Sequence, residues 1–393
     1  MEIKDAKQPT TSLVGKIYFS EFFSESLAVY ALIPLLFEQY GGQSAERVGI
    51  LLASWQILIV LFEIPTGIVA DKYGRKASMQ LARIARLLCF PLWLAFPSFT
   101  GLLAGIVFLA LGDALSSGSL EAYSYDELED KTAYNKLRQQ TVAIHLAAFS
   151  AAGIYAFALN ADFKLIIIAS MISTSIGLFF SSMLPNDRHH HKQAVTIKTL
   201  LKDAKEQIAG HPVTLKRFVQ ASLMMTLLVF FIEQITLFYS DAGQSAKSVS
   251  ALMAVGNLLT FGLLWILHSI EEWTRRYQSQ ILALCFILFG GAMASGLVWV
   301  QIGAIFLSVR LIRVAFLHTT NDLQHAVAGS ARATISSLSS FVGKLSASAG
   351  IFLVGYLSRT SSDSRLPIYV IGTGFLTVFI CLELFWRPQH GKR

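Results

Sequence analysis

Cysteine and charged residues are both scarce in this chain, and each scarcity excludes a class of protein. The three cysteines, Cys89, Cys285 and Cys381, lie in apolar stretches without metal-binding spacing, which excludes a disulfide framework or a thiolate metal site. Charged residues make up 15% of the 393 residues, against about 25% in soluble domains, whereas 54% are hydrophobic. One soluble core cannot bury that much apolar surface, and the 28 phenylalanines exclude a disordered chain. The composition therefore predicts an integral membrane protein.

Several sequence signatures are also missing. The nucleotide-binding pattern GxxxxGK[ST] is absent, which excludes an ATP-driven pump within this chain. The patterns HExxH and GxSxG are absent as well, and we predict neither an enzyme nor a cofactor. The polar start MEIKDAKQPTTSLVGK is not typical of a signal peptide, so the first apolar stretch is expected to be a retained helix.

Long apolar runs fill most of the chain. A membrane-spanning helix needs about 20 mostly apolar residues, and alternating strand patterns are absent. The runs predict twelve spans in an all-α integral membrane protein, at 15–37, 46–69, 78–96, 99–124, 139–159, 163–184, 214–239, 247–268, 278–294, 296–319, 335–357 and 366–386.

Lysine and arginine predict the orientation of these spans. If both termini are cytoplasmic, 22 of the 32 lysines and arginines lie in inner segments and five in outer ones. This bias is typical of a multi-pass protein with positive inner loops, and short loops favour a bacterial inner membrane. Because the basic residues are spread over several loops, the net charge of +7 does not indicate a nucleic-acid partner.

The longest polar gap divides the spans into six and six. It predicts an N-terminal six-helix bundle (1–186), a cytoplasmic linker with a basic amphipathic helix (187–213) and a C-terminal six-helix bundle (214–393). The halves resemble each other at an offset of 200 residues, which places Asp71 over Glu271 and Arg75 over Arg275. Such weak internal symmetry is expected of transporters built from repeats. The linker's His189–His191 tract is interpreted as solvated, and metal binding there is left open.

The loop after the second span carries the most specific motif. Gly67 to Lys76 reads GIVADKYGRK, with the spacing G-x-x-x-D-x-x-G-R-K. This loop resembles the signature loop of the major facilitator superfamily, and the twelve spans and the six-plus-six division agree with that resemblance. The segments LFEIPTG (61–67) and SGSLEAYSYD (117–126) look most similar to its drug-efflux and small-molecule exporter branches. Two features depart from proton-driven drug exporters, because span four lacks an arginine and span five lacks a proline.

The resemblance implies a mechanical role for this loop. Gly67 would let two helices approach closely, and Gly74 would permit a tight turn. Asp71 would accept from backbone N–H groups at a helix start in the opposite half, and Arg75 would reach Asp126. Together with Lys76, these residues form the predicted conformational latch.

Replacing Asp71 by Asn tests this latch. We expect the Asp71→Asn protein to fold and to transport more slowly, because the amide loses the charge that a helix N-terminus favours. Transport assays at matched expression measure the effect. Wild-type transport by a well-expressed variant would refute the role.

Charged residues inside the first six spans are candidates for coupling, because a buried charge must be paired or face a watery cavity. Glu21 and Glu25 share one face of span one, and one of them is expected to hold a proton. Asp113 is the deepest acid, and Glu25 and Asp113 are the expected protonation sites. The alternative for Asp113 is a structural role as the partner of an arginine on a neighbouring helix. His145 is either a proton relay or a hydrogen-bonded buried histidine. Glu63 and Glu121 are expected to pair with Arg83 or Arg86.

The second six spans contain a different set of charges. Arg310 and Arg313 lie deep in span ten, three residues apart, and their planar guanidinium groups suit an anionic group on the substrate. The alternative is pairing with Glu233 or Asp113. Glu233 and Lys344 complete the predicted substrate and coupling residues. Aromatic residues are expected at the membrane interfaces or around a pocket, namely Trp55, Tyr123, Phe231, Trp265 and Trp299.

These observations predict a secondary active transporter that works by alternating access between two six-helix halves. We expect proton-coupled efflux of a small organic solute such as a drug, a siderophore-like chelator or a metabolite. A symporter that imports an anionic or zwitterionic solute, or a uniporter, is the alternative. The expected partners are the bilayer, the solute and protons, with the chain functional as a monomer.

Overall fold

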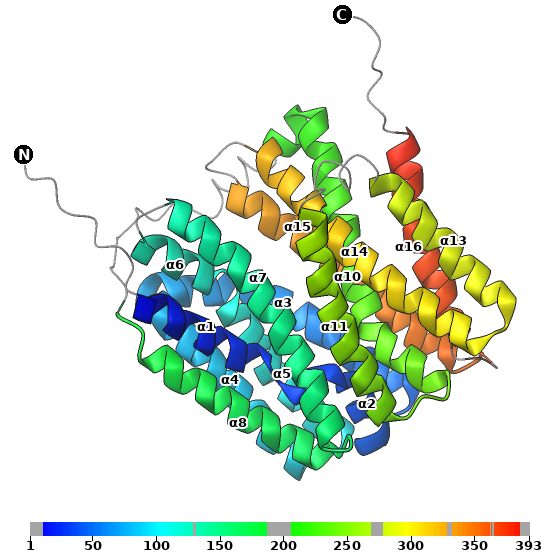
Figure 1. Cartoon of the computed structure of the whole chain (residues 1–393), viewed down its shortest axis with the longest axis horizontal. Coiled ribbons are helices and arrows are strands. Elements are labelled where there is room, and N and C mark those ends of the chain that lie inside the picture. The colour runs from blue at the N-terminus through cyan, green and yellow to red at the C-terminus, as the bar shows by residue number, and fades with distance from the viewer. Residues whose placement is uncertain are drawn as a thin grey trace, which may run out of the picture. The chain divides into compact units, whose positions relative to one another are not determined.

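The computed structural model describes residues 11–128, 131–186, 206–268, 278–327, 332–361, 363 and 365–385. In these ranges every regular element is helical, and no strand occurs (Figure 1). The elements before the linker are α1 (Thr11–Glu25), η1 (Ala28–Ala31), α2 (Ile33–Leu35), η2 (Leu36–Tyr40), α3 (Ala45–Tyr73), α4 (Arg75–Ala95), α5 (Phe99–Ser116), α6 (Ser119–Leu128), α7 (Lys131–Ala158) and α8 (Phe163–Ser182). Those after it are α10 (Pro212–Asp241), α11 (Ala246–His268), α13 (Gln278–Ser295), α14 (Val298–Ala326), α15 (Arg332–Ser358) and α16 (Arg365–Phe385).

The helices have the surface of a membrane protein. Nine helices in the described ranges are long and apolar enough to cross a bilayer. The other three predicted spans correspond to α1 with its continuation, to α4 with its two buried arginines, and to α13. On α8, Leu165, Ile168, Ile172 and Phe179 are exposed along one helical face. A soluble monomer rarely exposes such a stripe, whereas lipid covers it readily. The predicted all-α membrane fold is therefore confirmed.

The prediction of one continuous helix over 15–37 is wrong. The α-helix ends at Glu25, and Leu27 is extended before the chain continues through η1, α2 and η2. Two serines of α8 bind backbone groups at this break: Ser173 Oγ donates to the carbonyl oxygen of Phe23 at 2.9 Å, and Ser170 Oγ accepts from the backbone N–H of Val29 at 3.0 Å. These side chains replace helical partners that the backbone would otherwise lose inside the membrane.

The prediction of one helix over 99–124 is also wrong. Ser98 caps the start of α5, and the helix ends at Ser116. Gly118 then adopts φ +70°, a left-handed conformation that glycine accepts without strain, before α6 begins at Ser119. The break separates the membrane part of the span from the polar segment that follows it.

Two compact units make up the chain. The first contains residues 1–191 together with 244–261, and the second contains 192–243 and the residues from 262 onward. Residues 244–261 belong with the first unit because α11 packs on α7, where a Cβ at Gly153 would lie 2.7 Å from the carbonyl oxygen of Ser250. The bundle boundaries predicted at 186 and 214 stay a prediction.

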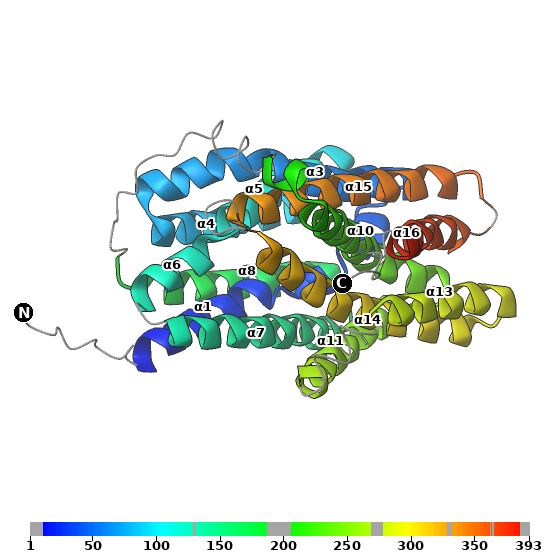
Figure 2. The same ribbon diagram turned by 90° about the horizontal axis from the view of Figure 1, so that it is seen from above.

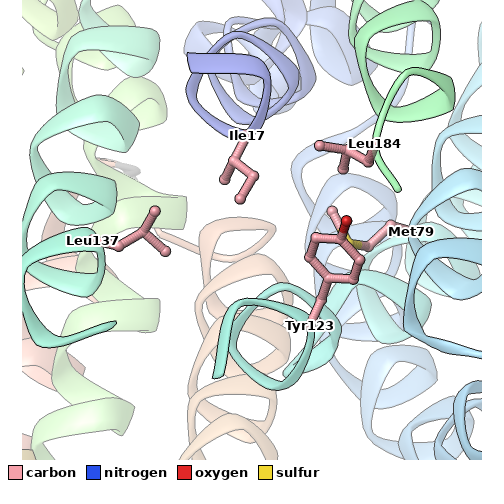
Figure 3. Packing of buried hydrophobic residues seen from close by; sticks show 5 residues of the cluster. All are labelled: Ile17, Met79, Tyr123, Leu137 and Leu184. Atoms are coloured by element: carbon pink, nitrogen blue, oxygen red, sulfur yellow. The ribbon is translucent and has the colours of Figure 1, made fainter. Parts of the chain in front are cut away.

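In the first unit, α4 packs against α5 and α8, and α1 packs against α7 and α8. Figure 3 shows a core cluster that joins several of these helices: Ile17, Met79, Leu137 and Leu184 surround Tyr123. Each of these side chains is at most 4% exposed. Tyr123 was expected at an interface or pocket, and it is a core residue whose hydroxyl donates to the carbonyl oxygen of Pro185.

Gly112 sets the distance between α4 and α5. A Cβ at this position would lie 2.7 Å from Arg86 Cγ and 2.8 Å from the carbonyl oxygen of Ala82. We expect Gly112→Ala to destabilise the protein by about 1–3 kcal/mol, because the helices must separate and the Arg86 contacts must shift. Thermal unfolding of the purified proteins measures this loss.

Gly303→Ala on α14 is the matched control, since a Cβ there meets no atom within 4 Å. It is expected to be neutral or to stabilise by at most about 1 kcal/mol through helix propensity. Equal melting temperatures for the two variants would contradict the packing role of Gly112.

In the second unit, α10 packs against α14, α15 and α16, and α13 packs against α14 and α16 (Figure 2). An aromatic core joins α10, α13 and α16 through ring pairs of Phe231 with Phe289, Phe289 with Tyr369, and Phe238 with Tyr369. These rings hold the helices that flank the buried part of α14.

Candidate functional site

Two buried arginines on α4 organise a polar cluster inside the first unit. Arg83 and Arg86 are 2% and 4% exposed, and their spacing of three residues places them on neighbouring parts of one helix face. Arginine stays protonated inside proteins, so both carry a charge away from water. Such charges require carboxylate partners and further hydrogen bonds.

Arg83 binds the first of these carboxylates. Its Nη2 donates to Glu21 Oε1 at 2.9 Å and to Ser20 Oγ at 2.7 Å, and its Nε donates to Ser24 Oγ at 2.7 Å. Nη1 donates to the Met79 carbonyl oxygen at 2.7 Å, so each guanidinium nitrogen has an acceptor. All these side chains lie on α1 or α4.

The second oxygen of Glu21 connects the cluster to α7. Glu21 Oε2 lies 3.3 Å from His145 Nε2. The Glu21 side chain is 7% exposed, whereas that of His145 is 35% exposed. A buried carboxylate therefore contacts an imidazole that is only partly covered by protein.

Arg86 binds two more carboxylates. Its Nη1 donates to Glu25 Oε1 at 3.0 Å, and its Nε and Nη2 both donate to Asp113 Oδ1 at 3.1 and 2.8 Å. Nη1 also donates to the carbonyl oxygen of Ser24 in the last turn of α1. A cation at a helix C-terminus is favourable, so Arg86 stabilises the end of α1 as well as the two acids.

Asp113 has two further donors. Trp55 Nε1 on α3 donates to Oδ2 at 2.9 Å, and Tyr30 OH donates to Oδ1 at 3.3 Å. The Tyr30 ring also lies 6.0 Å below the Arg86 guanidinium. Three different elements thus fix this carboxylate beside Arg86.

The structure brings together four of the predicted residues, Glu21, Glu25, Asp113 and His145. It corrects the partners expected for the arginines: Arg83 and Arg86 form their ion pairs with Glu21, Glu25 and Asp113, and none with Glu63. The side chain of Glu121 lies outside the described residues. The pairing alternative for Asp113 is realised, with an arginine of the neighbouring helix.

Sequence reasoning missed Tyr30 and placed Trp55 either at a membrane interface or around a pocket. A donor from each of them reaches Asp113. A sequence signal for Arg83 and Arg86 was present, because they are three residues apart within a predicted span, as Arg310 and Arg313 are. Tyr30 carried no such signal, because its position follows from the break after α1.

The predicted charges of the second unit are distributed over three helices. Arg310 on α14 is 3% exposed, and Glu233 on α10 is 7% exposed. Arg313 lies one turn beyond Arg310, and Lys344 lies half-buried on α15. Near the end of α14, Asp322 pairs with Arg217 at 3.1 Å. Among the described residues, no group of three His, Cys, Asp or Glu side chains is placed to hold a metal ion.

The family model of the Major Facilitator Superfamily matches residues 16–351. The chain belongs to the major facilitator superfamily. It is 23% identical over 384 residues to YxaM, an MFS-type transporter of Bacillus subtilis (strain 168), and the alignment covers 93% of each protein.

Solved structures of the superfamily share the fold. A crystal structure of a mutant of the nucleoside transporter NupG matches with a TM-score of 0.77 at 15% identity, covering 95% of this chain and 100% of the other. A D-xylose-proton symporter matches with a TM-score of 0.75 at 12% identity, covering 96% and 97%. The protein is therefore a multi-pass membrane transporter of the major facilitator superfamily.

The loop that resembles the superfamily signature joins α3 to α4. Gly74 adopts φ +97° between the two helices, so the predicted tight turn is present and requires glycine. Lys76 Nζ donates to Asn186 Oδ1 at 3.1 Å and to the Leu184 carbonyl oxygen, beyond the end of α8. A Cβ at Gly67 meets no atom within 4 Å, and the predicted role of Gly67 in a close helix approach stays a prediction.

The other predicted latch residues are Arg75, Asp71 and Asp126. Arg75 begins α4 and is half-buried. The side chains of Asp71 and Asp126 and the whole His189–His191 tract lie outside the described residues. Their predicted roles stay predictions.

Proposed function

We propose that this transporter exports a small organic solute in exchange for protons, and that the cluster around Arg83 and Arg86 carries the proton. The observation that supports this proposal is the composition of the cluster. It holds three carboxylates, two guanidinium groups and one imidazole, connected by contacts of 2.8–3.3 Å.

The charges of the cluster favour binding of one proton. With three ionised acids, two arginines and a neutral His145, the cluster has one negative charge in excess. One added proton makes it neutral, and a neutral cluster is favoured where water is scarce. Asp113 accepts from Tyr30 and Trp55 as well as from Arg86, so both of its oxygens have donors. The proton then has its place on Glu21 or His145.

The contact between Glu21 and His145 supplies a route for this proton. His145 has the more exposed side chain of the two, and Glu21 lies between it and Arg83. A proton taken up from water by the imidazole reaches Glu21 across one contact of 3.3 Å. Protonation of Glu21 weakens its ion pair with Arg83, and this links the proton to the packing of α1 on α4.

Direction and location rest on sequence features. The segments 61–67 and 117–126 resemble exporter branches, and the lysine and arginine distribution favours cytoplasmic termini in a bacterial inner membrane. A related fold in a D-xylose-proton symporter keeps import as the second candidate. The proposal also includes a conformational latch, formed by Asp71, Gly74, Arg75, Lys76 and Asp126.

A comparison of a deletion strain with its parent tests the function and its direction. Small solutes are profiled inside the cells and in the medium. An exported solute accumulates inside the deletion strain and falls in its medium, whereas an imported solute shows the reverse. Reconstituted protein is then supplied with that solute while a pH dye inside the liposomes reports proton movement. Solute transport without proton movement would refute the coupling and indicate a uniporter.

A further inference from the structure

The buried part of α14 carries a guanidinium edge that has no hydrogen-bond partner among the described residues. Arg310 is 3% exposed, and its Nε and Nη2 have no hydrogen-bond partner in the described part of the chain. These two nitrogens lie on one edge of the planar group, the edge that receives both oxygens of a carboxylate. Because arginine remains charged, this edge presents buried positive charge that an anion would neutralise.

In the first unit, the corresponding edge of Arg86 binds a carboxylate. Arg86 uses its Nε and Nη2 to hold the Asp113 carboxylate at 3.1 and 2.8 Å. In the second unit, Asp322 is paired with Arg217 and Asp363 with Arg365. No ion pair of Arg310 is present within the residues that the structure describes. Within the described residues, Asp113 thus fills this edge of Arg86, and no side chain hydrogen-bonds to the corresponding edge of Arg310.

The surroundings of Arg310 suit an organic anion. The Phe306 ring lies 4.9 Å from the guanidinium carbon, one turn earlier on α14, and covers one face of the group. Tyr239 on α10 interacts electrostatically with Arg310, and its buried hydroxyl has no partner in the described residues. Arg313 adds a second positive charge that acts on Arg310. The environment of this guanidinium thus combines an aromatic face, a buried hydroxyl without a described partner and a second positive charge.

We propose that Arg310 and Tyr239 bind the carboxylate of a small organic anion, and that this anion is the transported solute. The claim that the anion is transported rests on the proposed function. The claim that it binds rests on the geometry of α14 and α10. It assigns the solute to the organic carboxylates.

Binding of carboxylates and their neutral amides to the full-length protein in nanodiscs tests the proposal. The probes are benzoate with benzamide, nicotinate with nicotinamide, and succinate with succinamide. We expect at least one carboxylate, and not its amide, to raise the melting temperature of the wild-type protein. Arg310→Gln should weaken this binding roughly 10- to 100-fold, because a charge-assisted pair of hydrogen bonds is lost. Arg365→Gln is the matched control in the same unit and should bind like wild type.

Arg310→Lys separates the fork from the charge. Lysine keeps the positive charge and loses the planar edge, so this variant should bind the carboxylate more weakly than wild type. It provides the test if Arg310→Gln does not fold. The proposal is overturned if no carboxylate stabilises the wild-type protein, if the amides stabilise it equally, or if folded Arg310→Lys binds like wild type. Stabilisation by phenyl phosphate without any carboxylate would overturn the assigned class. These binding measurements need no proton gradient. A failure of the proton-coupling proposal therefore does not affect their outcome, and a failure of carboxylate binding does not affect the test of proton coupling.

Discussion

Arg86→Gln is expected to destabilise the protein by about 3–5 kcal/mol. The substitution leaves Glu25 and Asp113 facing each other without the cation that holds both of them. Their side chains are 14% and 17% exposed, so water replaces only part of the lost interaction. Removing one partner of a buried ion pair typically costs this much, because the remaining charge is uncompensated. Unfolding of the purified protein in detergent, followed by intrinsic fluorescence, measures the loss.

A second substitution tests the reason for this loss. Arg86→Gln combined with Asp113→Asn removes one positive and one negative charge, so it should recover at least a third of the lost stability. Arg47→Gln is the control, since Arg47 is exposed and contacts the Phe99 ring, and its loss should stay below about 1 kcal/mol. A double variant as unstable as Arg86→Gln would show that Arg86 acts through the end of α1 and not through charge balance.

Composition and periodicity were sufficient to predict the fold class. Apolar runs of about 20 residues predict spans because the bilayer allows few alternatives to a helix. The same reasoning failed at Glu25, where the helix ends inside a predicted span. That end depends on serines of α8, such as Ser170, whose contacts with α1 cannot be read from a local sequence pattern.

The membership of the polar cluster was largely predictable, whereas its pairing was not. Glu21, Glu25, Asp113 and His145 were each identified because buried ionisable groups are rare in membrane spans. Which acid meets which arginine depends on the rotation and depth of the helices. Gly112 contributes to this, because the close approach of α4 and α5 places Arg86 beside Asp113. A pattern of charges along one span carries no information on that distance.

Arg310 illustrates a further limit of the sequence. Arg310 and Arg313 share one pattern, yet their surroundings differ: Arg310 is buried against Phe306, and Arg313 is only partly buried by its surface area. The sequence predicts two equivalent anion ligands. The structure distinguishes Arg310 by the unpartnered edge of its guanidinium.

Glu21→Gln is expected to abolish the coupling of solute transport to protons while leaving solute binding intact. The amide has nearly the shape of the carboxylate and can still accept a hydrogen bond from Arg83, but it cannot bind a proton. Solute-driven proton movement in liposomes should fall on the order of 100-fold, a loss typical of removing a group that transfers protons. Solute exchange without a gradient should persist in this variant, because the ion pairs of Arg86 with Glu25 and Asp113 are unchanged.

Glu206→Gln provides the matched control, since Glu206 is exposed and lies outside the predicted spans. It should retain wild-type proton movement. The Glu21→Gln protein must also be shown to fold, because Arg83 loses a buried counter-charge, which costs about 3–5 kcal/mol. A folded Glu21→Gln protein that still moves protons with the solute at the wild-type rate would exclude Glu21 as the carrier. In that case the proton would have to bind elsewhere in the cluster, and the excess negative charge on Glu25 and Asp113 around Arg86 would become the site to test.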